Sequence, residues 1–281
     1  MILTPKIHLL KHAFDIHFPN GKKIPRDVYS IILFGAEITL VDCGVKNSYH
    51  QIFEYIVQQG RQPHEIKRLI LSHSHPDHMG SAAKIKELTG CKVLAHIEEK
   101  EWIEHIDVQC KKRPIPGFYE LLDESVRIDK FLDHNQILQI DENMSLKILH
   151  SPGHSKGLIN IEFVEDKILF TADSIPLKND MPNYESYNDL MDSLEQIKKN
   201  TSFETLISSW ADPLSEKSKI NQLIEAGEEY IKKIDSLVNL YYSSEYESPF
   251  ESCEKVIDEL KLPHLFVNSI VDKAFRSHLD L

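Results

Sequence analysis

A chain of 281 residues is long enough to bury one large hydrophobic core, or one core with a smaller appendage. Its formal net charge of −12 disfavours a nucleic-acid partner, because phosphate binding needs clustered basic residues and the densest patch, KKRP at 111–114, is short. We interpret that patch as solvated surface charge. No apolar run could span a membrane, and the N-terminal stretch MILTPKIHLLKHAFD lacks the apolar core of a signal peptide, so we expect a cytoplasmic protein without a membrane partner.

Short β-branched segments alternate with amphipathic segments over the first two thirds of the chain. This alternation predicts an α/β fold with polar residues where strands end, the place where open sheets carry their sites. A tight turn is expected at Gly35 and a helix end at Gly90. The expected strands lie at 28–34, 37–44, 67–73 and 91–96, and the expected helices at 47–60 and 80–90.

The pattern lapses from about residue 107 to 125, where RPIPG disfavours regular structure, so we expect a loop there. A second block of strands and a helix follows, and residues beyond Pro213 show helical periodicity almost throughout. We therefore predict an α/β domain at 1–213 and a helical segment at 214–281. In this second half, strands are expected at 136–140, 145–151, 158–174 with a turn at VEDK, and 203–210, and helices at 187–199, 215–242, 250–262 and 266–279.

The stretch LSHSHPDHMG at 71–80 places three histidines and an aspartate within six positions. In an extended chain His73 and His75 project to one side, and Pro76 then turns the chain so that Asp77 and His78 begin a helix. Imidazole and carboxylate groups side by side are what divalent first-row metals select. We interpret the stretch as a metal site, with Asp77 and His78 available to a second metal, in preference to a polar loop.

Two further segments end strands with a polar residue. SPGHS at 151–155 presents His154 after a Pro-Gly turn, and LFTADS at 169–174 carries Asp173 near its end. Alone, each is weak, because a histidine after Pro-Gly is usually a loop residue and such an aspartate is usually a turn former or helix cap. Their occurrence together, in order and at strand ends, favours one shared site.

With LVDCG at 40–44, these segments resemble the metallo-β-lactamase superfamily, in the order of that family and over residues 25–213. The resemblance implies a four-layer αββα sandwich with a metal site at the upper edge of two sheets, and a C-terminal helical segment that covers the site as in glyoxalase II-like members. It implies Asp42 as a supporting residue behind the ligands. The implied ligands are His73, His75 and His154 for the first metal, Asp77 and His78 for the second, and Asp173 as a bridge.

One expected ligand is absent from the sequence. The family usually ends its site with a strand followed by Gly-His, and Trp210 of LISSWADP stands in the position of that histidine. Tryptophan does not ligate metals, so Asp212, His264, His278 or water would have to take its place. The alternatives are a cap or turn role for Asp212 and surface positions for the two histidines.

The reaction class we expect is hydrolysis, with a metal-bound hydroxide that attacks a small-molecule ester, thioester or lactone. Asp77 is the expected catalytic residue, which orients the nucleophile and moves a proton to the leaving group. The expected cofactor is zinc, with two ions, and iron or manganese are alternatives. The RPIPG loop and the helical segment are expected to form the substrate walls. Assembly is left open, with a homodimer as one possibility.

Two other functions remain open. In a persulfide-dioxygenase-like enzyme, one iron would be held by His73, His154 and Asp173, and a damaged second site would suit that arrangement. A metal-binding or sensor domain without turnover is the third possibility, and the number of intact ligand positions disfavours it. The helical segment has no obvious basic cluster to hold the carboxylates of glutathione, which disfavours a close glyoxalase II equivalent.

Overall fold

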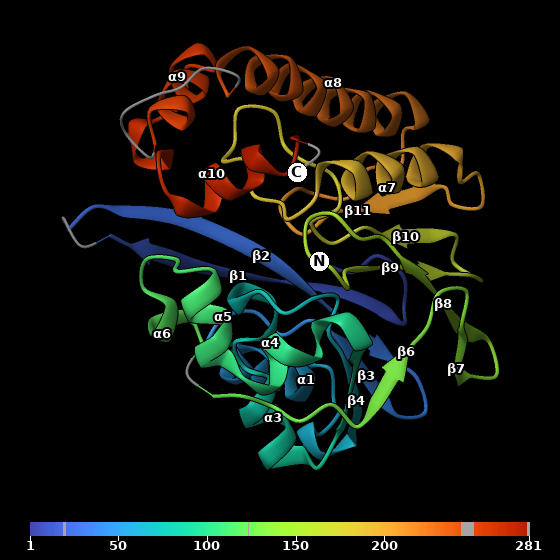
Figure 1. The fold of residues 1–281 in the computed structure, drawn as a ribbon. Helices are drawn as coiled ribbons and strands as arrows, with labels where there is room; N and C mark the ends of the chain where they lie inside the picture. Colours follow the sequence, from blue (N-terminus) through green and yellow to red (C-terminus); the bar gives the residue numbers. More distant parts are fainter. Residues whose placement is uncertain (19–20, 123, 243–249, 280–281) are drawn as a thin grey trace.

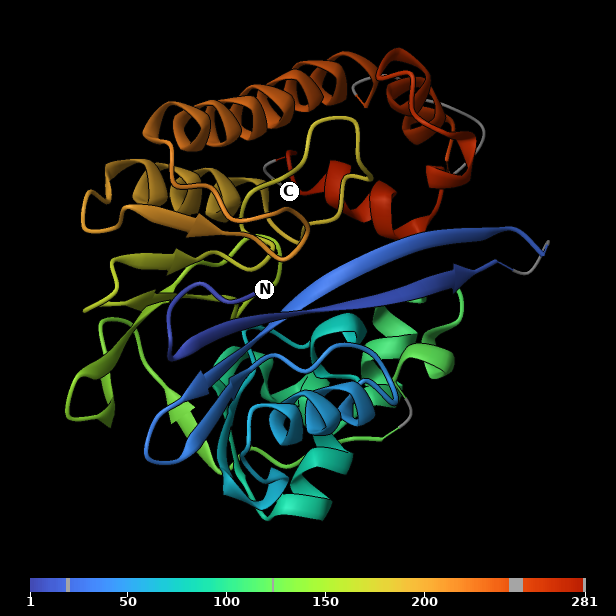
Figure 2. The ribbon, with the colours of Figure 1, turned by 180° about the vertical axis from the view of Figure 1, so that it is seen from behind.

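The computed structural model describes residues 1–18, 21–122, 124–242 and 250–279. Two mixed β-sheets lie face to face, and helices cover the outer face of each (Figures 1 and 2). The first sheet has the strand order β1-β2-β3-β4-β5-β6 and the second β11-β10-β9-β8-β7. The predicted αββα sandwich with a C-terminal helical extension is confirmed.

The first sheet and its helices come from the N-terminal half of the chain. A long antiparallel hairpin, β1–β2, pairs with β3, and β3 to β6 then run parallel to one another. The strands are β1 Ile7–His17, β2 Lys23–Phe34, β3 Ile38–Val41, β4 Ile66–Ile70, β5 Lys92–His96 and β6 Lys130–Leu132. The helices are α1 Tyr49–Gln58, α2 Pro76–Met79, α3 Ala82–Thr89, α4 Lys100–Glu104, α5 Ile106–Lys112 and α6 Phe118–Leu121, with 3-10 turns at Pro63–Glu65 and Ile97–Glu99.

The second sheet is antiparallel apart from its last pair, β10 with β11. Its outer helices pack on it in one hydrophobic cluster, in which Leu169 and Leu206 of the sheet are buried together with apolar residues of α7, α8, α9 and α10.

The predicted division of the chain into an α/β domain and a helical segment at residue 213 stays a prediction. The strands are β7 Ile137–Asp141, β8 Met144–His150, β9 Ile159–Phe163, β10 Ile168–Phe170 and β11 Thr205–Ile207, and the helices are α7 Tyr187–Lys199, α8 Lys217–Tyr241, α9 Glu251–Glu259 and α10 Ser269–Arg276, with a 3-10 turn at His264–Phe266.

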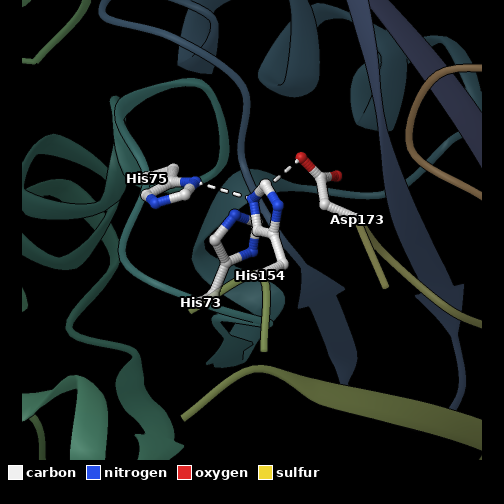
Figure 3. Close-up of side chains that lie close together, drawn as sticks. All are labelled: His73, His75, His154 and Asp173. Atoms are coloured by element: carbon white, nitrogen blue, oxygen red, sulfur yellow. Dashed lines mark hydrogen bonds and ion pairs between the residues drawn. The ribbon is translucent and has the colours of Figure 1, made fainter. Parts of the chain in front are cut away.

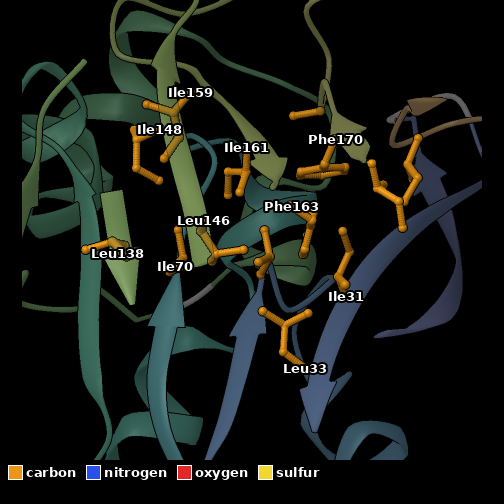
Figure 4. Packing of buried hydrophobic residues seen from close by; sticks show 14 of the residues in the cluster. Ile31, Leu33, Ile70, Leu138, Leu146, Ile148, Ile159, Ile161, Phe163 and Phe170 are labelled. Atoms are coloured by element: carbon orange, nitrogen blue, oxygen red, sulfur yellow. The ribbon is translucent and has the colours of Figure 1, made fainter. Parts of the chain in front are cut away.

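The core between the sheets comes from alternate residues of facing strands (Figure 4). Ile31 and Leu33 of β2 face inward against Phe163 of β9, whereas Ile32 between them packs with the helices on the other face. Strands covered on both faces are expected to be apolar almost throughout, and all three residues of β10 are apolar and buried. The packed sandwich fixes the positions of the strand ends, and polar loops emerge from them at one edge.

The long hairpin was not predicted in full. Only residues 28–34 of it carry a continuous apolar pattern, and the distal half is interrupted by charged residues such as Lys23 and Asp27. Cross-strand pairing nevertheless continues from Ile7↔Leu33 to His17↔Lys23. Phe14, Ile16 and Phe18 alternate with polar residues, as expected for a strand with one covered face, and with Ile24 they line a cavity and are not part of the sandwich core.

The predicted loop at 107–125 was wrong in part, because α5 covers its first residues and α6 lies within it, whereas the RPIPG segment at 113–117 belongs to neither helix; residue 123 lies outside the described residues. The two prolines and Gly117 act only locally, since α5 ends at Lys112 and α6 begins after Gly117, whose φ is 68°. The interpretation of KKRP as solvated was also wrong for one residue. Arg113 is only 9% exposed. The predicted strand at 67–73 ends at Ile70, and that at 203–210 covers only Thr205–Ile207.

A buried histidine of the hairpin makes stability depend on pH. His12 of β1 donates from Nδ1 to Gln51 Oε1 at 2.8 Å, and Ser30 Oγ lies 2.7 Å from Nε2. Burial lowers the pKa of His12 from 6.5 to about 4. Between these two values the unfolded chain binds more protons than the folded chain, so the free energy of unfolding falls as the pH falls.

We expect His12→Gln to reduce this pH dependence, because glutamine keeps a donor and an acceptor but does not titrate. Urea unfolding at pH 7 and pH 5 should show that the variant loses less stability than the wild type, by on the order of 1–2 kcal/mol. Comparison of the two proteins cancels the pH dependence that they share. Equal losses in both proteins would contradict the prediction.

Candidate metal centre

Three loops at one edge of the sandwich bring four predicted ligands together (Figure 3). His73 and His75 lie in the loop between β4 and α2, His154 in the loop after β8, and Asp173 in the loop after β10. One ligand atom from each lies within 4.8 Å of the others, and all four side chains are buried. Nδ1 of His75 is 2.9 Å from Nε2 of His154, which is 3.4 Å from Asp173 Oδ2.

A second group shares Asp173 with the first. Asp77 and His78 lie on α2, where Pro76 begins the helix as its first residue, and they approach Asp173 within the same 4.8 Å limit. Nε2 of His78 is 3.4 Å from Asp77 Oδ2 and 3.4 Å from Asp173 Oδ1. His78 is fully buried and Asp77 is half-buried. All six sequence-predicted residues therefore lie in one continuous cluster.

The donor atoms of this cluster fit divalent metals. Nε2 of His73, Nε2 of His78 and Oδ1 of Asp173 are buried and have no hydrogen-bond partner among the described residues. A buried polar atom without a partner costs free energy, and several such atoms aimed at a common point are satisfied together by a metal ion. Neutral imidazoles with carboxylates are a donor set typical of zinc.

Asp42 orients two of the imidazoles from behind. Its Oδ1 accepts from Ser72 N at 2.7 Å, and its Oδ2 accepts from Ser72 Oγ at 2.7 Å and from His78 Nδ1 at 2.9 Å. Because the Ser72 hydroxyl donates to Asp42, its oxygen is left to accept from His73 Nδ1 at 3.0 Å. These contacts favour a proton on Nδ1 of both histidines, which leaves Nε2 as the nitrogen that could ligate a metal. These contacts agree with the role that the resemblance implied for Asp42.

Glu99 joins the two ligand loops, and its role was missed by the sequence analysis. The side chain is 2% exposed. Its Oε2 accepts from Ser74 N at 2.9 Å, and its Oε1 accepts from Ser155 Oγ at 2.6 Å and Gly157 N at 2.7 Å. Ser74 lies between His73 and His75, and Ser155 follows His154. One carboxylate therefore fixes the relative position of loops that are far apart in the sequence.

Burial and charge prepare the imidazoles for metal binding. Burial lowers the pKa of His154 to about 4 and holds the pKa values of His73 and His75 well below 6.5. These three histidines are therefore neutral at pH 7, which is the form that ligates metals. Burial also acts to lower the pKa of His78, but nearby carboxylates, Asp173 foremost, outweigh it and raise that pKa. This part of the cluster attracts positive charge, whether a proton or a metal ion.

Gly80 lets the chain return against the sheet directly after the ligand segment. Its N donates to Gly44 O at 2.8 Å, and a Cβ placed on it would lie 2.4–2.5 Å from backbone atoms of Val45, Lys46 and Leu121. Backbone cannot move aside as a flexible side chain can. The position therefore requires glycine.

We expect Gly80→Ala to lower the free energy of unfolding by about 3 kcal/mol, at the upper end of the usual cost of overpacking. Gly60→Ala is the matched control, because Gly60 has a φ of 75° and nothing lies within 4 Å of its added Cβ. The control should lose only about 1 kcal/mol, the cost of the left-handed backbone conformation. Urea denaturation measures both. Equal losses would show that the close backbone approach is unimportant.

The sequence profile described as the metallo-beta-lactamase superfamily matches residues 24–202. The chain belongs to this superfamily. Hydroxyacylglutathione hydrolase GloC of Haemophilus influenzae is 30% identical over 109 residues, 38% of this chain and 49% of that protein. A beta-lactamase-like protein 2 homolog of Caenorhabditis elegans is 28% identical over 203 residues, 70% of this chain and 58% of that protein. The chain spans about half or less of the length of the first hydroxyacylglutathione hydrolases it matches.

A solved structure shows the same fold over nearly the whole chain. A metallo-beta-lactamase family protein of Thermus thermophilus has a TM-score of 0.72 at 18% identity and covers 99% of this chain and 93% of its own. Within the described part of the chain, none of the helices has the length and apolarity that a membrane span requires.

Trp210 supplies no donor atom to the ligand cluster. Its ring lies edge-on to His78, with 6.4 Å between ring centroids, and it forms part of the cavity wall.

The three residues that the sequence offered as substitute ligands contact other residues. Asp212 accepts from Tyr29 Oη at 2.6 Å, and His264 is exposed and pairs with Glu254. His278 is buried, not on the surface, and its two ring nitrogens contact Tyr184 Oη at 2.7 Å and Asp235 Oδ1 at 3.0 Å.

The ligand cluster opens onto a cavity of about 330 Å³. His75, Asp77, His154 and Asp173 of the cluster are among the residues that line it. The RPIPG segment and the C-terminal helices both contribute to its walls, and their expected role as substrate walls stays a prediction. Most of the remaining lining is apolar: Phe14, Ile16, Phe18 and Ile24 of the hairpin, Pro114, Ile115, Pro116 and Leu121, Ile175, Pro176, Leu177, Met181 and Pro182, and Ile231, Leu265, Phe266 and Ile270.

Proposed function

We propose that the protein is a zinc-dependent hydrolase that cleaves a thioester or a related ester with a substantial apolar group. The observation that carries this proposal is that two groups of buried metal ligands share Asp173 and open onto a largely apolar cavity. The relatives named hydroxyacylglutathione hydrolase support a thioester in particular. The described cysteines are free thiols, which suits action in the reducing cytoplasm.

The proposed site holds two zinc ions. His73, His75, His154 and Asp173 would hold the first, and Asp77, His78 and Asp173 the second. Water would take the ligand position of the second ion that is lost because Trp210 replaces the usual histidine. Zinc supplies a Lewis acid for the carbonyl oxygen and lowers the pKa of a coordinated water from about 15.7 toward 7. The second group offers fewer protein donors than the first, so we expect it to bind its metal more weakly.

Asp77 is the residue that we propose for proton transfer. It is half-buried at the first turn of α2, lines the cavity, and belongs to the second ligand group, which shares Asp173 with the first. The carboxylate accepts a hydrogen bond from the attacking water and so orients it, and it then carries the proton to the leaving sulfur or oxygen. The apolar walls hold the acyl or alkyl chain and keep bulk water away from the reacting carbonyl.

The test is hydrolysis of a panel of thioesters, esters and lactones by the zinc-loaded protein. We expect turnover of at least one thioester, and Asp77→Asn should lower kcat by about 100-fold or more with the first zinc retained. No turnover of any member by a fully loaded protein would overturn the proposed reaction. Unchanged kcat in Asp77→Asn would overturn the role of Asp77 alone.

A second candidate is oxygen chemistry on a persulfide with one iron. The observation in its favour is that Trp210 stands where a further ligand is usual, which leaves the second group with fewer donors. This candidate requires iron in the first group and consumption of O₂ with a persulfide substrate. Turnover with zinc and without O₂ would exclude it.

A further inference from the structure

One guanidinium in the cavity wall has no counter-ion among the described residues. Arg113 follows α5 in the RPIPG segment and is 9% exposed. Its Nη2 donates to Asn183 Oδ1 at 3.1 Å, but Nε and Nη1 are buried and have no hydrogen-bond partner in the described part of the chain. A buried charged donor without a partner is one of the most costly groups in a folded protein. Such a group in a ligand cavity indicates a partner that arrives with the ligand.

The carboxylates around Arg113 do not supply that partner. Asp77, Glu185 and Asp173 are near enough to act on its charge, yet the described residues form no ion pair with it. Asp77 and Asp173 also belong to the ligand groups, so bound metal would take up their negative charge. Metal binding would thus leave the positive charge of Arg113 with less nearby negative charge to balance it.

The other arginine of the cavity provides a contrast. Arg26 of β2 also lines the cavity, and its Nη2 lies 2.7 Å from Asp180 Oδ1 in an ion pair. The protein therefore pairs one cavity arginine internally and leaves the other without a described carboxylate partner. A purely structural arginine would be expected to resemble Arg26.

We propose that Arg113 binds a carboxylate of the substrate beside the metal centre. The guanidinium forms strong charge-assisted hydrogen bonds with carboxylates, and the low polarity of the cavity strengthens them. The apolar walls take the hydrocarbon part of the same molecule, so the ligand class is an amphipathic acyl compound with one anionic end. That the ligand is an acyl compound rests on the hydrolase proposed above. The assignment of Arg113 as an anion site does not depend on that proposal.

Calorimetric titration of the zinc-loaded protein with octanoate and with 1-octanol tests the proposal. The two probes share a hydrocarbon chain and differ in charge. The wild type should bind octanoate at least about tenfold more tightly than octanol, as expected for one set of charge-assisted hydrogen bonds. Arg113→Gln should remove at least most of this preference and leave octanol binding unchanged.

Two matched variants complete the design. Arg26→Gln removes an arginine from the same cavity wall but should keep the preference for octanoate, because Arg26 is already paired. Arg113→Lys keeps the charge without the planar fork and should fall between the wild type and Arg113→Gln. Zinc content and circular dichroism verify that each variant is folded. If Arg113→Gln does not fold, the wild-type preference and the Arg113→Lys result still decide the question.

Unchanged octanoate affinity in a folded Arg113→Gln would overturn the proposal and assign the carboxylate to the metal alone. Absence of any preference in the wild type would overturn it as well. These outcomes are separate from failure of the hydrolase. If the wild type hydrolyses a thioester and Arg113→Gln keeps its octanoate affinity, the hydrolase stands and the anion site is rejected. If Arg113→Gln loses octanoate affinity and the wild type hydrolyses no ester or thioester, the anion site stands and the hydrolase is rejected.

Discussion

His75→Ala is expected to abolish metal-dependent hydrolysis while the protein remains folded. His75 contributes a donor to the first ligand group, and its Nδ1 lies 2.9 Å from Nε2 of His154. A metal that polarises a carbonyl contributes several kcal/mol to transition-state stabilisation, so its loss should reduce kcat/KM by at least about a thousandfold. The ligand lies in a loop at the sheet edge and not in the sandwich core, so circular dichroism should match the wild type.

His64→Ala is the matched control for this change. His64 is an exposed histidine in a 3-10 turn, outside both ligand groups. It should keep the metal content and the activity of the wild type. Full activity in a pure His75→Ala protein would show that the first ligand group has been assigned wrongly.

Glu99→Ala is expected to have the largest effect among residues that touch neither metal nor substrate. Three donors, Ser74 N, Ser155 Oγ and Gly157 N, would lose their buried acceptor. We expect the free energy of unfolding to fall by about 3 kcal/mol or more, since each unsatisfied buried donor costs about 1–3 kcal/mol. Because these donors position the two ligand loops, zinc affinity should also fall by about 10–100-fold.

Two variants separate this role from a general loss of charge. Glu98→Gln changes the exposed neighbour and should alter neither stability nor zinc affinity. Glu99→Gln should be intermediate, because its amide oxygen can still accept from Ser155 and Gly157 while its NH₂ group faces the N–H of Ser74. Zinc titration with a competing chelator and urea unfolding measure the two effects. Wild-type zinc affinity in a folded Glu99→Ala would contradict the positioning role.

The ligand cluster was largely predictable from the sequence because its chemistry is concentrated in short segments. His73 and Asp77 lie in one stretch of ten residues, and His154 and Asp173 each follow a strand with a clear apolar pattern. Parallel and adjacent strands bring such ends to one edge of a sandwich. The order of the segments then carried the resemblance to the family, and the fold followed from it.

Residues whose role depends on tertiary contacts were not predictable in the same way. Glu99 stands in the sequence IEEK, where an acidic residue is usually solvated, and only the packing of two distant loops buries it. Arg113 has the local pattern of a surface basic patch, yet the chain beyond α5 turns it into the cavity. The distal hairpin was missed although Phe14, Ile16 and Phe18 alternate with polar residues, because its strands carry several charged residues and its apolar face covers a cavity and not the sandwich core.

The metal content per chain tests the central claim most directly. The zinc-loaded protein, dialysed against buffer without chelator and measured by elemental mass spectrometry, should hold two zinc ions. His78→Ala should retain one, because it removes a donor of the second group and leaves the first intact. One zinc ion per chain in both the wild type and His78→Ala would contradict the binuclear zinc centre. A wild type that binds iron in preference to zinc would contradict it as well.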